Sequence, residues 1–166
     1  MERLRTGEKV AGVAGVALLI IMFALDWFSV DASAGPFEVS VAGNAWQTMD
    51  VIRWFVLLTA LSGIALVAVT AAQSEPNLPV TTSALAAGIS ILTTLLVLYR
   101  LIDPPGSGDA EQFGVEVGRD LGAYLGLIAC AGVAYGSWTA MQDETVPDAG
   151  GSGRLRGEGA QRPPAA

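Results

Sequence analysis

The sequence contains no histidine, a single lysine at position 9 and a single cysteine at position 130. Without histidine the chain cannot form a Ser–His or Cys–His nucleophile pair, an HExxH zinc site or an imidazole proton relay. Lys9 is not part of a GxxxxGK[ST] loop, and a lone cysteine excludes an intrachain disulfide. We therefore predict a protein that is not an enzyme, with no catalytic residue, no cofactor and no metal site.

Charged residues are also scarce, at 15% of the chain, whereas a soluble domain has about 25%. The formal net charge is −7, with 9 Lys and Arg against 16 Asp and Glu. Binding to nucleic acid through a general basic surface requires clustered Lys and Arg, so we predict no nucleic-acid partner. Because 52% of the residues are hydrophobic, the expected partner is the lipid bilayer.

Four apolar runs are long enough to cross a bilayer, whose hydrocarbon core of about 30 Å needs about 20 helical residues. The predicted spans are 10–28, 51–72, 79–102 and 121–141. We expect an all-α membrane protein in which residues 1–144 form a four-helix transmembrane domain. Residues 145–166 lack hydrophobic periodicity and are predicted to be a disordered cytoplasmic tail.

The distribution of basic residues predicts the orientation of the spans. Arg3, Arg5 and Lys9 precede the first span, whereas residues 29–50 contain no basic residue. The positive-inside rule and an even number of spans then place both termini in the cytoplasm of a plasma (inner) membrane protein. An alternative remains open, in which the first run is a secretory signal cleaved near residues 32–34, leaving three spans.

The predicted first outer loop, residues 29–50, carries a pattern typical of strands. Apolar residues alternate over 28–32 and again over 37–41, with Ala34, Gly35 and Pro36 between the two runs. This pattern predicts a short extracytoplasmic β-hairpin beside the outer ends of the helices. The second outer loop contains Asp109, Glu111 and Glu116, whose spacing fits no helix-loop-helix calcium site.

Small residues recur at helical spacing along the fourth predicted span and form one continuous stripe. The members of this glycine stripe are Gly118, Gly122, Gly126, Ala129, Gly132 and Gly136. Such stripes allow close helix packing in lipid. Two interpretations remain open: a homodimer seam, or packing within the chain against Ala11, Gly12 and Gly15 of the first span.

Six ionisable residues are predicted to lie near the outer ends of the four spans. They are Asp26, Arg53, Arg100, Asp103, Arg119 and Asp120. Charges at this depth are costly unless they are paired or hydrated. One interpretation is a structural ring of ion pairs, with Arg100 near Asp103 and Arg53 near Asp26 or Asp50. The other is a shallow polar pocket in which an arginine binds an anionic headgroup or carboxylate.

Three segments, LLVLYRLIDPPG (95–106), GAYLGLIACAGVAYGSWTAMQDE (122–144) and ALDWF (24–28), resemble small uncharacterised four-span inner-membrane proteins of actinobacteria. The resemblance covers most of the chain before the tail. It implies a four-helix integral membrane protein and no particular activity. The arrangement of four spans with a larger first outer loop is also similar to that of claudin-type proteins, although the paired loop cysteines of that family are missing here.

These observations predict a non-enzymatic structural or interaction protein of the cell envelope. It would pack with itself or with another membrane protein through the glycine stripe and the outer loops. The alternative function is a small-molecule or lipid binder or transporter that uses the outer Arg and Asp residues.

Overall fold

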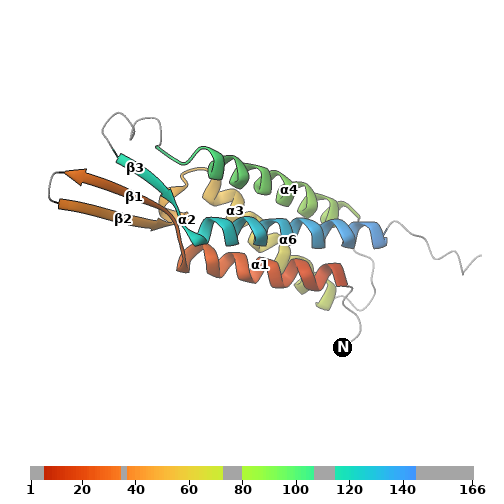
Figure 1. The fold of residues 1–166 in the computed structure, drawn as a ribbon. Helices are drawn as coiled ribbons and strands as arrows, with labels where there is room; N and C mark the ends of the chain where they lie inside the picture. The colour runs from red at the N-terminus through yellow and green to blue at the C-terminus, as the bar shows by residue number, and fades with distance from the viewer. Residues whose placement is uncertain (1–5, 35–36, 73–79, 107–114, 145–166) are drawn as a thin grey trace, which may run out of the picture.

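A computed structural model describes residues 6–34, 37–72, 80–106 and 115–144. Within these residues, four long helices run side by side and a small sheet extends beyond one end of the bundle (Figure 1). The long helices are α1 (Thr6–Ala24), α3 (Ile52–Ala72), α4 (Val80–Ile102) and α6 (Leu121–Glu144). The remaining elements are β1 (Asp26–Ala34), β2 (Phe37–Asn44), the short helix α2 (Ala45–Thr48) and β3 (Val115–Arg119).

The prediction of four long apolar helices is confirmed, and each of them is long and apolar enough to cross a membrane. Three of them lie within a few residues of the predicted ranges. The first helix instead covers 6–24, about one turn earlier than the predicted 10–28. The chain leaves the helix there because β1 begins at Asp26 and forms hydrogen bonds with strands on both of its edges. The predicted tail, residues 145–166, lies outside the described residues.

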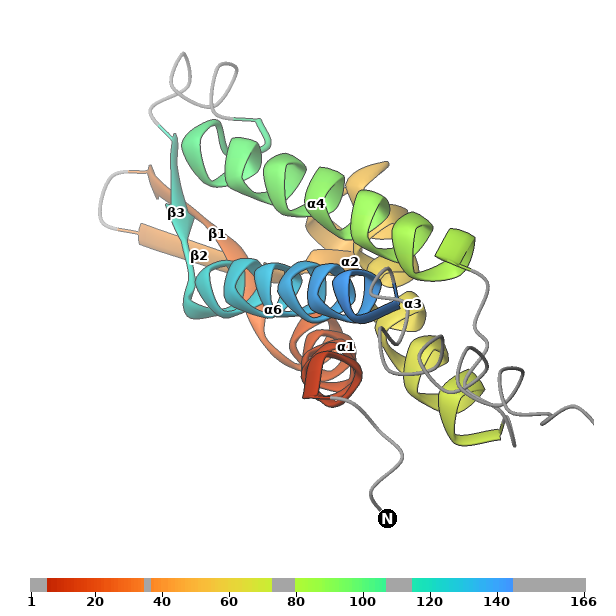
Figure 2. The same cartoon turned by 90° about the vertical axis from the view of Figure 1, so that its right-hand side faces the viewer.

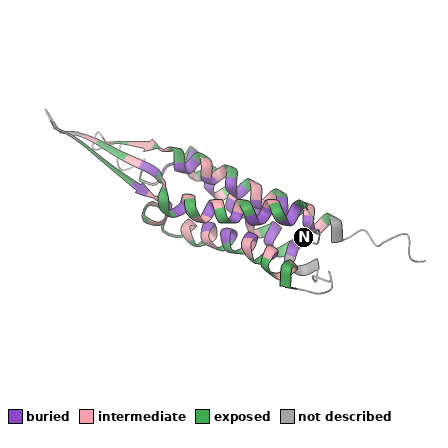
Figure 3. Ribbon diagram, turned by 90° about the horizontal axis from the view of Figure 1, so that it is seen from below, coloured by how far each residue is buried: buried purple, intermediate pink, exposed green. Residues whose placement is uncertain are grey.

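Each long helix packs most extensively against two neighbours. Helix α6 lies between α1 and α4, and α3 contacts the same two helices (Figure 2). Buried residues line the helix faces that meet, while the outward faces are exposed and apolar (Figure 3). An apolar exterior is what a helix bundle surrounded by lipid requires.

Helices α1 and α3 approach closely because small residues line their contact. A Cβ atom at Gly15 would lie 2.7 Å from the carbonyl oxygen of Ala60, and one at Gly63 would lie 2.5 Å from that of Ala11. Real Cβ atoms essentially never come so close to another heavy atom, so any larger residue would push the helices apart. Close backbone approach of this kind is the usual basis of helix association in lipid.

The contact between α3 and α4 contains a buried polar pair. The Thr59 hydroxyl donates a hydrogen bond of 2.8 Å to the Thr93 hydroxyl, and both side chains are fully buried. Thr93 also donates to the carbonyl oxygen of Ile89 in its own helix at 2.9 Å. The Thr59 and Thr93 hydroxyls therefore have partners and join α3 to α4.

The sheet has the strand order β2-β1-β3, and both neighbours are antiparallel to the central strand β1. Val30 lies opposite Val41 of β2 and Val117 of β3. The prediction of two strands missed β3, whose sequence from Val115 to Arg119 shows only a short alternation. The turn predicted between β1 and β2 contains Gly35 and Pro36, which lie outside the described residues.

Candidate functional site

The sheet has one apolar and one polar face. Residues directly opposite each other, and residues two positions apart along a strand, share a face. One face, here called the valine face, therefore consists of Val30, Ala32, Val39, Val41, Val115 and Val117. Its side chains are incompletely covered, with 41% of Val30, 56% of Val39 and 62% of Val41 exposed. The opposite face contains Asp31, whose partners across the two strand pairs are Ser40 and Glu116.

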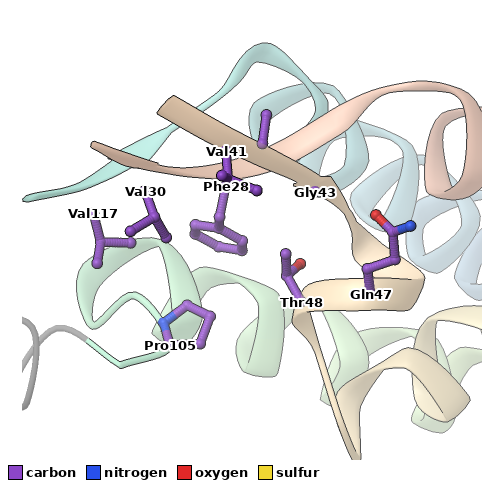
Figure 4. A pocket seen from close by; sticks show the side chains of 9 residues that line it. Phe28, Val30, Val41, Gly43, Gln47, Thr48, Pro105 and Val117 are labelled. Atoms are coloured by element: carbon purple, nitrogen blue, oxygen red, sulfur yellow. The ribbon is translucent and has the colours of Figure 1, made fainter. Parts of the chain in front are cut away.

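A cavity of about 290 Å³ lies beneath the base of the valine face. Figure 4 shows the side chains of Phe28, Val30 and Val117 on one side and those of Thr48 and Pro105 across from them. Phe28 is almost fully buried at the inner end of the cavity. The valine face is thus covered only near the helices, and its outer half has no partner within the described part of the chain.

The rim of the cavity is held by a helix cap. The Asn44 side chain accepts a hydrogen bond from the backbone N–H of Gln47, and the Gln47 side chain accepts one from the N–H of Asn44, which forms a capping box for α2. The Asn44 amide also donates to the carbonyl oxygen of Phe23 at the end of α1. One side chain therefore joins β2, α2 and α1 and fixes the geometry of the rim. The Asn-x-x-Gln spacing is the sequence signal that could have identified it.

Trp27 anchors the sheet to the helix bundle. Its side chain is fully buried, and its indole N–H donates to the carbonyl oxygen of Ile21 at 3.1 Å. A Cβ atom at Gly122 would lie 2.7 Å from the indole, and the ring also covers Gly126. The backbone N–H of Asp120 donates to the carbonyl oxygen of Trp27 at 3.0 Å. The start of β1 is therefore fixed to the start of α6.

The glycine stripe is occupied within the chain. Gly122 and Gly126 hold Trp27, while a Cβ at Gly132 would lie 3.0 Å from the Ala14 side chain and one at Gly136 would lie 2.5 Å from the Ala11 backbone nitrogen. Ala129 is buried in the main core.

Two parts of the stripe prediction need correction. Gly118 belongs to β3 rather than to the fourth helix, because the chain there pairs with β1. Of the partners proposed on the first span, Ala11 meets the stripe, whereas Gly12 and Gly15 face α3.

The six predicted ionisable residues do lie at the sheet end of the bundle, beside the ends of the four long helices. Arg119 connects β3 to α4, because its guanidinium donates to the carbonyl oxygens of Leu101 and Ile102. These are among the last carbonyls of α4, which lack partners within the helix and attract a positive charge. Asp103 follows α4 and accepts a hydrogen bond of 2.9 Å from the Tyr99 hydroxyl.

Arg53 binds aromatic rings rather than the predicted carboxylates. Its guanidinium donates to the carbonyl oxygen of Trp46 at 3.2 Å and lies 5.1 Å from the centre of the Trp46 ring and 5.9 Å from that of Trp54. A planar, weakly hydrated guanidinium stacks well on indoles, which explains why it takes this position instead of pairing with Asp26 or Asp50. Asp26 is exposed at the start of β1.

Three of the six residues, Arg53, Arg100 and Asp120, each have one buried polar atom without a hydrogen-bond partner within the described residues, which in Arg53 is the Nε atom. Within the described part of the chain, the Nε atom of Arg100 and the Oδ2 atom of Asp120 are buried without a hydrogen-bond partner.

The described residues contain no group of three or more acidic, Cys or His residues arranged to hold a metal ion. Asp109 and Glu111 of the second loop lie outside them.

Within the described residues, these features define a small helical protein with four helices able to cross a membrane and, at one end, a three-stranded sheet whose apolar face is partly uncovered. No protein-family model, curated protein or solved structure matches the chain. The resemblances drawn from the sequence therefore remain predictions.

Proposed function

We propose that the chain is a non-enzymatic integral protein of the plasma membrane, with both termini in the cytoplasm and the sheet outside. The four long apolar helices support insertion into a membrane. The basic residues Arg3, Arg5 and Lys9 before α1 support the orientation, because cytoplasmic segments carry an excess of Lys and Arg. On this orientation β1 and β2 form an extracytoplasmic hairpin, completed as a sheet by β3.

We further propose that two copies associate through their valine faces. The observation that carries this proposal is the exposure of Val30, Val39 and Val41 on one continuous apolar face outside the bundle. The glycine stripe supports it indirectly, since α1 and Trp27 already occupy the surface that the sequence suggested for self-association. Two copies in one membrane present their sheets at the same height, as a two-fold symmetric contact requires.

The size of the valine face limits the strength of the contact. Three strands of five residues cover about 240 Å² per copy, given about 3.3 Å per residue and about 4.8 Å between strands. Stable complexes in water bury about 1,200 Å² or more in total. The pair therefore depends on the membrane, which holds both copies in one plane and raises their effective concentration.

The test is a photo-crosslinking side chain placed at Val41 in cells that express two differently tagged copies. The matched control carries the same group at Ser40, the neighbouring exposed residue on the polar face. We expect a crosslinked pair containing both tags from position 41 and none from position 40. The absence of such a pair from position 41, or equal yields from both positions, would contradict self-association through this face.

A second candidate function, lipid or small-molecule binding by the outer charged residues, is supported by the buried Nε atom of Arg100. If this guanidinium binds an anionic group, Arg100→Ala should remove a bound lipid in native mass spectrometry while the thermal midpoint is kept. Arg100→Lys, which retains the charge, should keep most of the binding. Loss of folding in Arg100→Ala would instead assign the residue to the structural ring.

A further inference from the structure

Two apolar grooves flank α1 on the outside of the bundle, and both start near its N-terminal end, opposite to the sheet. One, of about 390 Å³, lies between α1 and α3 and includes Gly12 and Ala68. The other, of about 530 Å³, lies between α1 and α6 and includes Ala17 and Gly132. Small residues on the flanks of the helices leave both grooves open. They are separated by Val13, which lines both of them and is 73% exposed.

Both grooves begin at the same charged residue. Lys9 lines each of them and is exposed at the end of the first turn of α1, while its neighbour Glu8 is buried. Lys9 is the sole lysine of the sequence, and within the described residues its ammonium group forms no ion pair. Each groove thus combines an apolar channel with a cation at its mouth.

The lengths of the two grooves along α1 lie on either side of the thickness of one leaflet. The groove beside α6 extends from Lys9 to Ile21, which is about 18 Å at about 1.5 Å per helical residue. The groove beside α3 extends from Lys9 to Val16, or about 10 Å. Half of a hydrocarbon core of about 30 Å is about 15 Å. These lengths match acyl chains that enter from the leaflet at the N-terminal end of α1.

We propose that α1 binds one anionic, two-chain phospholipid, with its phosphate at Lys9 and one acyl chain in each groove, astride Val13. Charge complementarity selects this occupant: a cation beside two apolar channels fits a negative headgroup that carries two hydrocarbon tails. The proposal rests on the membrane insertion proposed above but is independent of the contact between valine faces.

The test is native mass spectrometry of the full chain after extraction from vesicles of equal parts phosphatidylglycerol and phosphatidylcholine. The wild type is expected to retain one phosphatidylglycerol in preference to phosphatidylcholine. Lys9→Gln should reduce this preference about five-fold, the effect expected of one basic residue at a membrane surface. Lys9→Arg should preserve it, which separates loss of charge from loss of folding.

Filling a groove provides a second test. Ala68→Phe places a large side chain in the groove beside α3, whereas Ala65→Phe makes the same change one turn earlier at an exposed residue that lines neither groove. We expect Ala68→Phe to reduce retention of the lipid and Ala65→Phe to leave it unchanged.

Three results would overturn the proposal: equal retention of both lipids by the wild type, unchanged lipid preference in Lys9→Gln, or the same retention in the two phenylalanine variants. Extraction with alkaline carbonate reports membrane insertion separately.

Discussion

The indole ring of Trp27 covers Gly126, so a side chain of the first strand packs directly on the last helix of the bundle. Gly122 lies under the same ring, one helical turn earlier. Two glycines form a slot that a tryptophan side chain fills, and this contact holds together segments that are far apart in the sequence. The ring fills this slot, so a Cβ atom added at either glycine would overlap it.

Replacing Gly126 with Val should therefore destabilise the protein. The new side chain would overlap the indole, and overpacking of this kind costs about 1–3 kcal/mol. The thermal midpoint in mild detergent should fall by about 2–4 °C for each kcal/mol. The matched control is Gly88→Ala in α4, where an added Cβ meets nothing within 4 Å. Gly88→Ala should keep or raise the thermal midpoint, because alanine favours helix more than glycine. If both variants lowered the midpoint equally, the loss would come from replacing a helical glycine and not from overlap with the indole.

Replacing Arg119 with Ala should loosen β3. The change removes the donors to the carbonyl oxygens of Leu101 and Ile102, and hydrogen bonds to a charged group contribute about 1.5–3 kcal/mol. Backbone amides of β3 should exchange with solvent faster, as measured by hydrogen–deuterium exchange. Glu116→Ala, on the exposed polar side of the same strand, should leave exchange unchanged. Unchanged exchange in Arg119→Ala would show that strand pairing alone positions β3.

Replacing Val41 with Asp should reduce self-association without unfolding the bundle. Val41 is 62% exposed in the single chain, so a carboxylate is tolerated there, whereas a second copy packed on it would bury the charge. Counting subunits by single-molecule photobleaching in membranes should show about ten-fold fewer pairs, the change that about 1.4 kcal/mol produces. Ser40→Asp places the same charge on the other face and should leave the pair count as in the wild type.

The Thr59–Thr93 hydrogen bond should couple α3 and α4 by a small amount. Hydrogen bonds between membrane helices contribute about 0.6 kcal/mol on average. A double-mutant cycle with Thr59→Val, Thr93→Val and the combined variant should give a coupling free energy of about this size. Additive losses in the two single variants would show that the hydroxyls contribute through packing alone.

The helices could be predicted from sequence because each is a long apolar run with local end signals. Pro79 and Asp103 flank the third span, for example, and the helix between them lies within a residue of the prediction. The first helix was placed one turn too late because the apolar residues of β1 continue the hydrophobic run. Periodicity alone does not separate the end of a buried helix from the start of a strand.

The candidate site was harder to predict because its geometry comes from tertiary contacts. The ionisable residues lie at one end of the bundle, but the position of Arg53 depends on two tryptophan rings and that of Arg119 on the end of another helix. The valine face requires β3, and a five-residue strand is too short for its alternation to stand out. Only pairing with β1 makes Val115 and Val117 part of a surface.

The central position of β1 in the sheet also determines when the protein can finish folding during its synthesis. Its two edges are bonded by β2, which follows at once, and by β3, which is synthesised much later with α6. Helix α1 depends in the same way on α3 and α6. During synthesis α1 and β1 therefore cannot complete their packing until β3 and α6 have been made. A chain truncated before β3 would keep an unpaired strand edge, and Trp27 would lack the glycines of α6 that hold its ring, so quality-control proteases would meet exposed signs of unfinished assembly.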